Sequence, residues 1–337
     1  MEFVEINARD AAGAIAAHSV RQADFAIKKG QTITPTHVER LLAQNIDRII
    51  VAKLAADDRG EDQVAHELAL IAAGAHARVA APFTGRANIY AEARGVLVVD
   101  VAGVDRFNAV DERATIATLP AWRVVEAGEM IATVKIIPFA VDAATVARAA
   151  AVAKGLVSVA AFAPKRVGVV STLLPGLKAK TVKKTLQALE ARLSRGGSAI
   201  ASETRVAHET GALADQLRAM AQADVDLVLA FGASAVTDRR DVIPAAIEQA
   251  GGKLIHVGMP VDPGNLLVLG EIGGKPTIGA PGCARSPREN GFDWVLQRLM
   301  ADVPVARTDI MKMGVGGLLM EIGARGQPRD PASDEAE

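Results

Sequence analysis

Between residues 164 and 258, apolar runs of strand length alternate with stretches of helical periodicity. The strand-like runs cover 167–172, 198–204, 225–231 and 253–258, and the helical patterns cover 180–194, 208–221 and 242–250. This alternation is typical of a mostly parallel sheet with helices packed on both faces. The sequence therefore predicts an α/β fold, a three-layer αβα sandwich, preceded by smaller α+β and β-rich domains.

The loops that follow these strands are rich in glycine, proline, serine and aspartate. They comprise Ser171 and Thr172, residues 232–241, residues 261–265 and residues 279–287. In open α/β sheets, ligands bind outside the carboxyl ends of the strands. We therefore expect these loops to meet at one edge and to form one site.

The loop after the apolar run 225–231 is the most informative. The run stops at Gly232, a small-residue loop GASAVT and the charged stretch DRRD follow, and a helical pattern then opens with Pro244 in its first turn. Such a loop presents backbone N–H groups to an anion, and Asp241 lies where a helix N-cap belongs. The loop contains neither G-x-G-x-x-G nor a Gly-Lys-Ser/Thr motif. An ordinary tight strand-to-helix connection remains the alternative.

The rest of the chain predicts further domains. We expect a small α+β domain at 1–77, whose first helix is capped by Thr34, and a β-rich domain with a linking helix at 78–163. Residues 122–125 and 130–134 alternate around a glycine-containing turn, which predicts a β-hairpin. The sheet domain covers 164–302, and a C-terminal extension covers 303–337, with its last residues disordered. The acidic residues between Asp57 and Asp62 fit a helix N-terminus better than a metal site.

Composition excludes several classes of function. The formal net charge is −1 with both signs spread along the chain, which argues against nucleic acid and anionic membranes as partners. The single cysteine, Cys283, fits a reducing compartment. The N-terminus lacks a secretory pattern, and no apolar run is long enough to span a bilayer. We expect a soluble, cytoplasmic protein.

Three loops, taken in order, resemble the molybdenum-cofactor biosynthesis domain, which is shared by molybdopterin adenylyltransferases and molybdopterin molybdenumtransferases. GASAVTDRRDVIPAA is similar to the first loop of the adenylyltransferases, Pro263-Gly264 to a Pro-Gly pair of the transferases, and residues 279–284 to their Gly-Leu-Pro-Gly-Asn-Pro. Residues 27–51 also resemble the smaller domains of the molybdenumtransferases.

The resemblance implies a pterin ligand with a dithiolene and a phosphate, and Mg²⁺ between phosphate oxygens. It implies molybdopterin as ligand or substrate, with molybdate and ATP or AMP as further ligands. Asp241 would hold the metal and act in catalysis, with Asp238 as a helper. The implied pterin- and phosphate-binding residues are Ser171, Thr172, Gly232, Ala233, Ser234, Arg239, Arg240, Pro263, Gly264, Asn265, Pro281, Gly282, Cys283 and Arg285.

The sequence also departs from the family pattern. Ala233 replaces the second glycine, and Asp262 and Asn265 stand where the transferases carry lysines. Lys178, Lys180, Lys183 and Lys184 form either a relocated phosphate grip or a solvated helix face. Cys283 is either a soft metal ligand or a small apolar residue.

Three functions compete. The first is a cofactor-assembly transferase, the second a non-catalytic molybdopterin carrier or sensor, and the third a nucleotide-dependent enzyme unrelated to molybdenum. The resemblance further implies a homodimer, with other cofactor-assembly proteins or apo-molybdoenzymes as partners.

Overall fold

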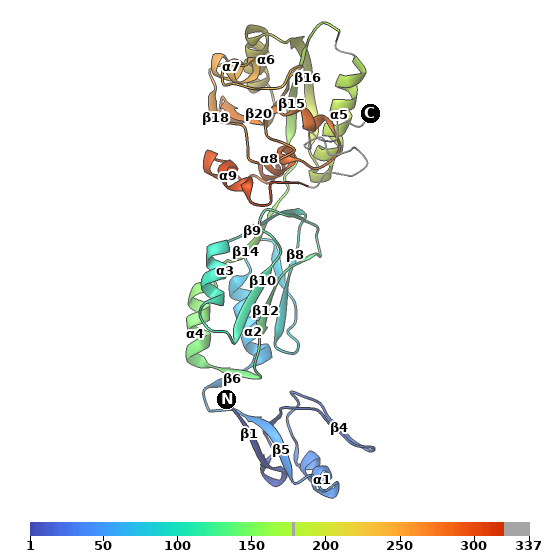
Figure 1. Cartoon of the computed structure of the whole chain (residues 1–337), viewed down its shortest axis with the longest axis vertical. Coiled ribbons are helices and arrows are strands. Elements are labelled where there is room, and N and C mark those ends of the chain that lie inside the picture. Colours follow the sequence, from blue (N-terminus) through green and yellow to red (C-terminus); the bar gives the residue numbers. More distant parts are fainter. Residues whose placement is uncertain (177–178, 320–337) are drawn as a thin grey trace, which may run out of the picture. The chain divides into compact units, whose positions relative to one another are not determined.

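A computed structural model describes residues 1–176 and 179–319. The chain divides into two compact units, Met1–Ala161 and a second one that begins at Phe162. Figure 1 labels the helices and strands of both units. The predicted division into three domains and an extension stays a prediction.

The first unit opens with a small antiparallel sheet. Its strands β1 (Glu2–Asn7), β5 (Arg48–Lys53) and β2 (Ile15–Ala16) lie in the order β1-β5-β2, beside the ribbon of β3 (Val20–Arg21) and β4 (Ala26–Ile27). Helix α1 (Pro35–Ala43) is capped by Thr34, whose hydroxyl accepts from the amide of His37, as the sequence predicts. Ile27, Ile33, Leu41 and Val51 form the buried centre of this part.

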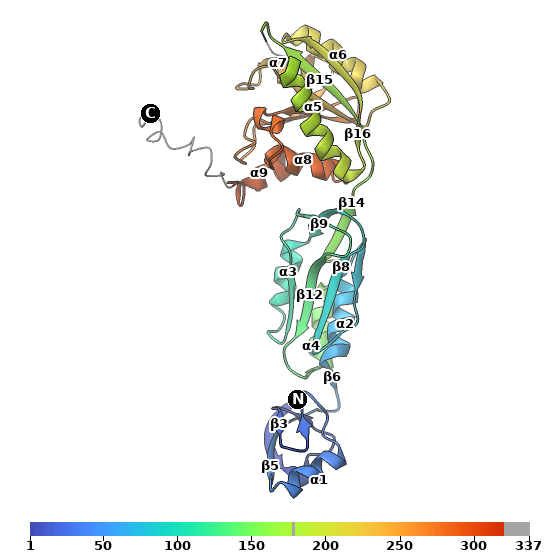
Figure 2. The same cartoon turned by 90° about the vertical axis from the view of Figure 1, so that its right-hand side faces the viewer.

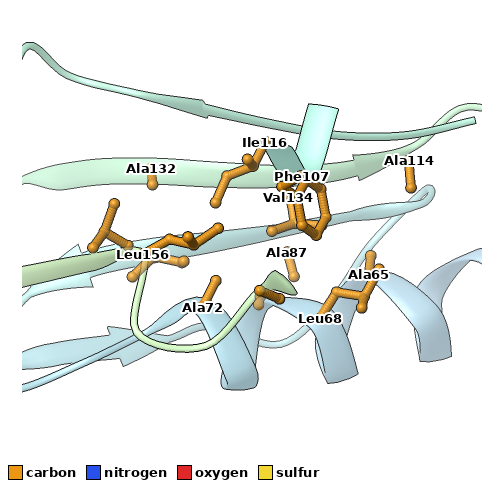
Figure 3. Packing of buried hydrophobic residues seen from close by; sticks show 14 of the residues in the cluster. Ala65, Leu68, Ala72, Ala87, Phe107, Ala114, Ile116, Ala132, Val134 and Leu156 are labelled. Carbon is orange, nitrogen blue, oxygen red and sulfur yellow. The ribbon is translucent and has the colours of Figure 1, made fainter. Parts of the chain in front are cut away.

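The remainder of the first unit combines helices with short antiparallel sheets. The strands are β6 (Asp58–Gly60), β7 (Ala77–Val79), β8 (Arg86–Ala91), β9 (Gly95–Val99), β10 (Ala114–Thr118), β11 (Val124–Val125), β12 (Met130–Ile136), β13 (Ala140–Asp142) and β14 (Val157–Ala161). The helices are α2 (Glu61–Ala72), α3 (Val101–Asn108) and α4 (Ala143–Val152). The largest of these sheets has the order β10-β12-β8-β7. Figure 3 shows Leu68 of α2 and Phe107 of α3 packed against side chains of the sheet, including Val134.

The predicted hairpin between 122–125 and 130–134 is wrong. The turn exists, since the amide of Glu129 donates to the carbonyl of Glu126. The strands on its two sides enter different sheets: β11 pairs with β9, whereas β12 pairs with β10 and β8. Alternation and a turn define local geometry only, and partner choice depends on strands distant in sequence.

The second unit is built on a six-stranded sheet of order β16-β15-β17-β20-β19-β18. Its strands are β15 (Arg166–Leu173), β16 (Ala199–Ala207), β17 (Leu227–Phe231), β18 (Lys253–Val257), β19 (Val268–Ile272) and β20 (Lys275–Ala280). The helices are α5 (Ala179–Leu193), α6 (Thr210–Gln222), α7 (Val242–Gln249), α8 (Gly291–Met300) and α9 (Arg307–Met311), with a short 3₁₀ turn η3 (Gly282–Arg285).

The second unit confirms a mixed α/β fold with a mostly parallel sheet. Strands β16, β15, β17 and β20 run parallel, and β19 runs antiparallel to both of its neighbours. One core joins the sheet to α5 and α8, and another joins it to α6 and α7. Figure 1 shows α6 and α7 on one side of the sheet and α8 on the other, and Figure 2 shows α5 beside β16. The β19–β20 hairpin was not predicted.

The disorder predicted from Gly323 onward falls on residues that lie outside the described ones. Among the helices that the structure does describe, none combines the length and the apolar character needed to cross a bilayer.

Candidate functional site

Strand register brings the predicted loops to one edge of the sheet in the second unit. Ser171 of β15 pairs with Phe231 of β17, and Phe231 pairs with Ala280 of β20. The loops that begin at Gly232 and Pro281 therefore leave neighbouring strands side by side. Val257 and Val268 pair next to Gly279, so the 258–267 loop leaves from the same edge.

Thr172 ties three strand ends together. Its Oγ1 accepts the amide of Ala233 at 2.8 Å and lies 2.8 Å from Nδ1 of His208, which follows β16. The side chain is 1% exposed. Thr172 thus fixes the start of the 232–241 loop. Its hydroxyl already forms hydrogen bonds within the protein.

Ser171 differs from its neighbour. It is buried, and its Oγ has no hydrogen-bond partner within the described ranges. Side chains alternate along a strand, so Ser171 lies on the face opposite Thr172, with Val167 and Val169 in the core beneath α5. A buried hydroxyl without a partner costs about 1–3 kcal/mol, which a ligand that hydrogen-bonds it would recover.

Arg285 lies over this face, at the end of η3. One terminal nitrogen donates to the carbonyl of Gly232 at 2.6 Å and the other to Oγ1 of Thr185 in α5 at 2.9 Å. The guanidinium carbon is 5.8 Å from the centroid of the Phe231 ring. Burial lowers the pKa of this guanidinium, but an arginine stays protonated at physiological pH.

The charge of Arg285 has no compensating carboxylate in the part of the chain that the structure describes. Its two contacts are with a carbonyl and a hydroxyl, both neutral. A guanidinium has five N–H donors, so donors remain after these contacts. A half-buried cation of this kind is electrostatically costly without an anion, and planar N–H donors match the oxygens of a phosphate.

Asp241 caps α7, as the sequence predicts. Its Oδ1 accepts the amide of Val242 at 2.7 Å, and its Oδ2 accepts the amide of Thr237 at 3.0 Å. Asp238 is exposed and pairs with Arg240 at 2.7 Å, and this hydrogen bond lowers the pKa of Asp238. Ser234 and Arg239 are exposed in the same loop.

The described carboxylates form no cluster of the kind that a metal site requires. Within residues 1–176 and 179–319, no group of three histidine, cysteine or acidic side chains could hold an ion. Two acidic residues around the start of α2 bind backbone groups: Asp58 of β6 accepts the amide of Ala55 and pairs with the amino group of Met1 at 2.6 Å, and Asp62 in the first turn of α2 accepts the amide of Gly85. The assignment of Asp241 as a magnesium ligand stays a prediction.

The Pro263-Gly264 loop packs against the start of α8. The carbonyl of Pro263 accepts the amide of Gly291 at 2.9 Å, and Gly264 has a φ of 142°. A Cβ at Gly264 would lie 2.7 Å from that amide nitrogen. Asn265 is exposed, and its carbonyl accepts the amide of Met259. The contacts of this loop are thus internal ones that fix its backbone.

Pro281, Gly282 and Cys283 lead from β20 into η3. The carbonyl of Cys283 accepts the amide of Ser286 at 2.9 Å. Burial raises the pKa of the Cys283 thiol, which favours the protonated form. A protonated thiol is a poor ligand for a soft metal.

Two lysines of α5 line a hollow whose lining residues do not include Arg285. Lys180 and Lys183 line an open hollow of about 550 Å³, together with Glu190 and with Arg205 of β16. Arg205 is paired with Glu203 at 2.8 Å. Lys184 is exposed, and Lys178 lies outside the described residues.

The sequence did not single out Thr185, His208 or Arg192, which all contact the site or its loops. Thr185 and Arg192 lie within the predicted helix and outside every motif. No signal in the sequence distinguishes them from other residues of an amphipathic helix.

Comparisons with known proteins found only weak similarities. Residues 5–53 match the model of a domain of unknown function, DUF8806. The structure is similar to that of a molybdopterin biosynthesis MoeA protein from Pyrococcus horikosii, at 14% identity and a TM-score of 0.32, over 92% of this chain and 77% of the other. A molybdenum cofactor biosynthesis protein from Pyrococcus furiosus aligns at 11% identity and a TM-score of 0.24, over 92% of this chain and 65% of that one.

Comparison with the curated protein sequences gave no significant match. The chain thus bears a distant structural resemblance to MoeA proteins. Because both TM-scores are below 0.5, the assignment of a function rests on the residues of the site.

Proposed function

We propose that the second unit binds a phosphorylated pterin of the molybdopterin kind at the edge where β15, β17 and β20 end. The observation that carries the proposal is the half-buried guanidinium of Arg285, which has no carboxylate partner among the described residues and lies between Gly232 and Thr185. The unpartnered hydroxyl of Ser171 lies on the same face. The order of the three loops supports a pterin as the molecule that carries the phosphate.

In this proposal, Arg285 binds the phosphate through its remaining donors. The amide of Ala233 is engaged by Thr172, and the amides of the next residues of this loop, 234 and 235, are where a second phosphate oxygen would find donors. Arg239 and Arg240 belong to the same loop, although Arg240 is engaged by Asp238. Bound molybdopterin would supply its dithiolene as a ligand for molybdenum.

The residues fit a phosphate better than they fit a magnesium ion. Both oxygens of Asp241 accept backbone amides, and Asp238 is paired with an arginine. Mg²⁺ prefers one or two free carboxylates together with substrate phosphates. This observation favours the second candidate function, in which the protein carries or senses the cofactor without transferring molybdate or a nucleotidyl group.

Binding is tested with two pterins that differ only in the phosphate. We expect the wild-type chain to bind the phosphorylated pterin more tightly, and Arg285→Met to weaken that binding roughly 10- to 100-fold, the range for a hydrogen bond to a charged group. Arg288→Met is the matched control, because Arg288 is exposed and lies three positions further along. Equal affinities of the wild type for both pterins would refute the proposal.

Turnover separates the two candidate functions. Purified protein is incubated with molybdopterin, ATP, Mg²⁺ and molybdate, and the products are analysed by fluorescence after acid oxidation. Asp241→Asn retains a capping side chain but removes the charge. Turnover that this variant abolishes supports a transferase, whereas saturable binding without turnover supports the carrier. Self-association into a dimer stays a prediction, and sedimentation in dilute buffer tests it.

A further inference from the structure

We infer that Arg192 of α5 is a positioning residue that holds the backbone on both sides of Arg285 in its anion-binding arrangement before any ligand arrives. The inference rests on the proposed function of the site. It concerns a residue that lies 93 positions away in the sequence from the one it positions.

Arg192 bonds to the turn that carries Arg285. One terminal nitrogen donates to the carbonyl of Ala284 at 3.0 Å. The other donates to the carbonyls of Ser286 at 2.7 Å and Arg288 at 3.0 Å. The first two of these carbonyls belong to the residues directly before and after Arg285. Arg192 is therefore a shared donor for three carbonyls of this turn, in which Ala284 is buried and Arg285 and Ser286 are partly buried.

The charge of Arg192 is balanced, in contrast to that of Arg285. Its Nε is 2.6 Å from Oδ1 of Asp293 in α8, and both side chains are about nine-tenths buried. A further donor bonds the carbonyl of Ala188 in its own helix. All N–H groups of Arg192 are therefore used, and Arg192 cannot bind the ligand's anion itself.

Asp293 connects this contact to the beginning of α8. Its Oδ2 accepts the amide of Asn290 at 2.9 Å, which is part of the capping box of the helix. The side chain of Asn290 in turn donates to the carbonyl of Arg288 at 3.0 Å and to that of Cys283 at 3.4 Å. Residues 283–290 are thus held at both ends by groups that the Arg192–Asp293 pair anchors.

Two aromatic rings join the arginines. The guanidinium of Arg192 is 5.8 Å from the centroid of Phe292, and the rings of Phe292 and Phe231 are 6.5 Å apart. Phe231 carries the guanidinium of Arg285 on its own ring. The same buried cluster therefore positions both the Phe231 ring below Arg285 and the turn that carries Arg285.

The test uses the ratio of dissociation constants for the dephosphorylated and phosphorylated pterins, measured on the full chain. Arg192→Lys keeps a cation beside Asp293 but lacks the planar fork that reaches several carbonyls. We expect the ratio to fall to within about threefold of unity, while affinity for the dephosphorylated pterin changes little. Adding Arg285→Met to Arg192→Lys should cause no further loss of affinity for the phosphorylated pterin. A ratio that Arg192→Lys leaves at the wild-type value would overturn the inference.

Hydrogen exchange on the wild type provides a test that needs no variant to fold. A turn that is already formed predicts slow exchange of the amides of Ala284 and Ser286, which donate to the carbonyls of Pro281 and Cys283, without ligand and little change when phosphorylated pterin is added. Fast exchange that becomes slow only on binding would overturn the inference. If the wild type itself shows no preference for the phosphorylated pterin, the proposed function fails instead.

Discussion

The guanidinium of Arg285 lies 5.8 Å from the centroid of the Phe231 ring, and it donates to the carbonyl of Gly232, the next residue in the chain. Strand β17 therefore supplies both the flat surface below the cation and the acceptor that orients it. Phe231 is 1% exposed and cannot move aside without opening the core. This arrangement fixes a positive charge at the carboxyl edge of the sheet, and a fixed charge loses little entropy on binding an anion.

Removal of the Thr172 hydroxyl should destabilise the second unit. Thr172→Val leaves the amide of Ala233 and the ring of His208 without their buried partner, which costs about 1–3 kcal/mol. Urea unfolding in a Trp122→Phe background, followed by the emission of Trp294, measures the change. Thr172→Ser keeps the hydroxyl and should lose clearly less stability than Thr172→Val. Equal losses of stability for the two variants would contradict the role assigned to Thr172.

The stability of the first unit should depend on pH through Asp111. Hydrogen bonds from Arg113 lower the pKa of Asp111 to about 2. Because the pKa of Asp111 is lower in the folded state, the ionised carboxylate stabilises the fold at pH values above its ordinary pKa near 4. This stabilisation is lost as the pH falls through about 2. Arg113 is partly exposed, so we expect only about 1 kcal/mol.

This contribution is measured by comparing Asp111→Asn with the wild type in denaturant at pH 5 and pH 2.5. At pH 5 the variant should be less stable than the wild type. This difference in the free energy of unfolding should be smaller at pH 2.5. Asp105→Asn, an exposed aspartate of the same unit, is the control. If this difference did not change with pH, the charge of Asp111 would be excluded as its cause.

Gly264 should tolerate no side chain. Gly264→Ala would place a Cβ 2.7 Å from the backbone nitrogen of Gly291 and would also occupy a positive φ. Gly251→Ala shares the positive φ, but a Cβ there meets no atom within 4 Å. We expect about 1 kcal/mol of destabilisation for Gly251→Ala and a markedly larger loss for Gly264→Ala. Thermal unfolding compares the two, and similar losses would be inconsistent with the close approach.

Cys283 should react slowly with alkylating reagents. Burial raises the pKa of the thiol, so less thiolate is present at neutral pH than in a free cysteine. The rate with iodoacetamide, followed by mass spectrometry, should lie below that of glutathione and should increase as the pH rises. A rate equal to or above that of glutathione would refute this. Cofactor affinity of Cys283→Ser then decides whether the thiol is a ligand, since an unchanged affinity removes that role.

Much of the second unit could be predicted because its signals are local. The end of β17 at Phe231, the cap of α7 at Asp241 and the helix that contains Arg192 each follow from patterns within about one helical turn or strand. The β19–β20 hairpin was missed because its turn, Gly273-Gly274, was not recognised as a two-residue connection.

The site itself could be predicted only in outline. The loops at Gly232 and Pro281 follow from the rule that ligands bind at the carboxyl ends of parallel strands. Which charges are compensated does not follow: Arg192 and Asp293 are 101 residues apart, and nothing in either segment pairs them. The same distance in sequence hides that Arg285 has no carboxylate partner among the described residues. Compensation of charge is a property of packing, and packing is decided by contacts distant in sequence.

Because Arg285 has no carboxylate partner within the described residues, the stability of the protein should depend on the anions in its buffer. Any small oxyanion that occupies Arg285 adds RT ln(1 + [L]/Kd) to the stability of the folded form. The melting temperature should therefore rise with inorganic phosphate in the buffer by more than it rises in Arg285→Met. Buffer composition would then be a variable to control whenever this chain is purified, stored or assayed.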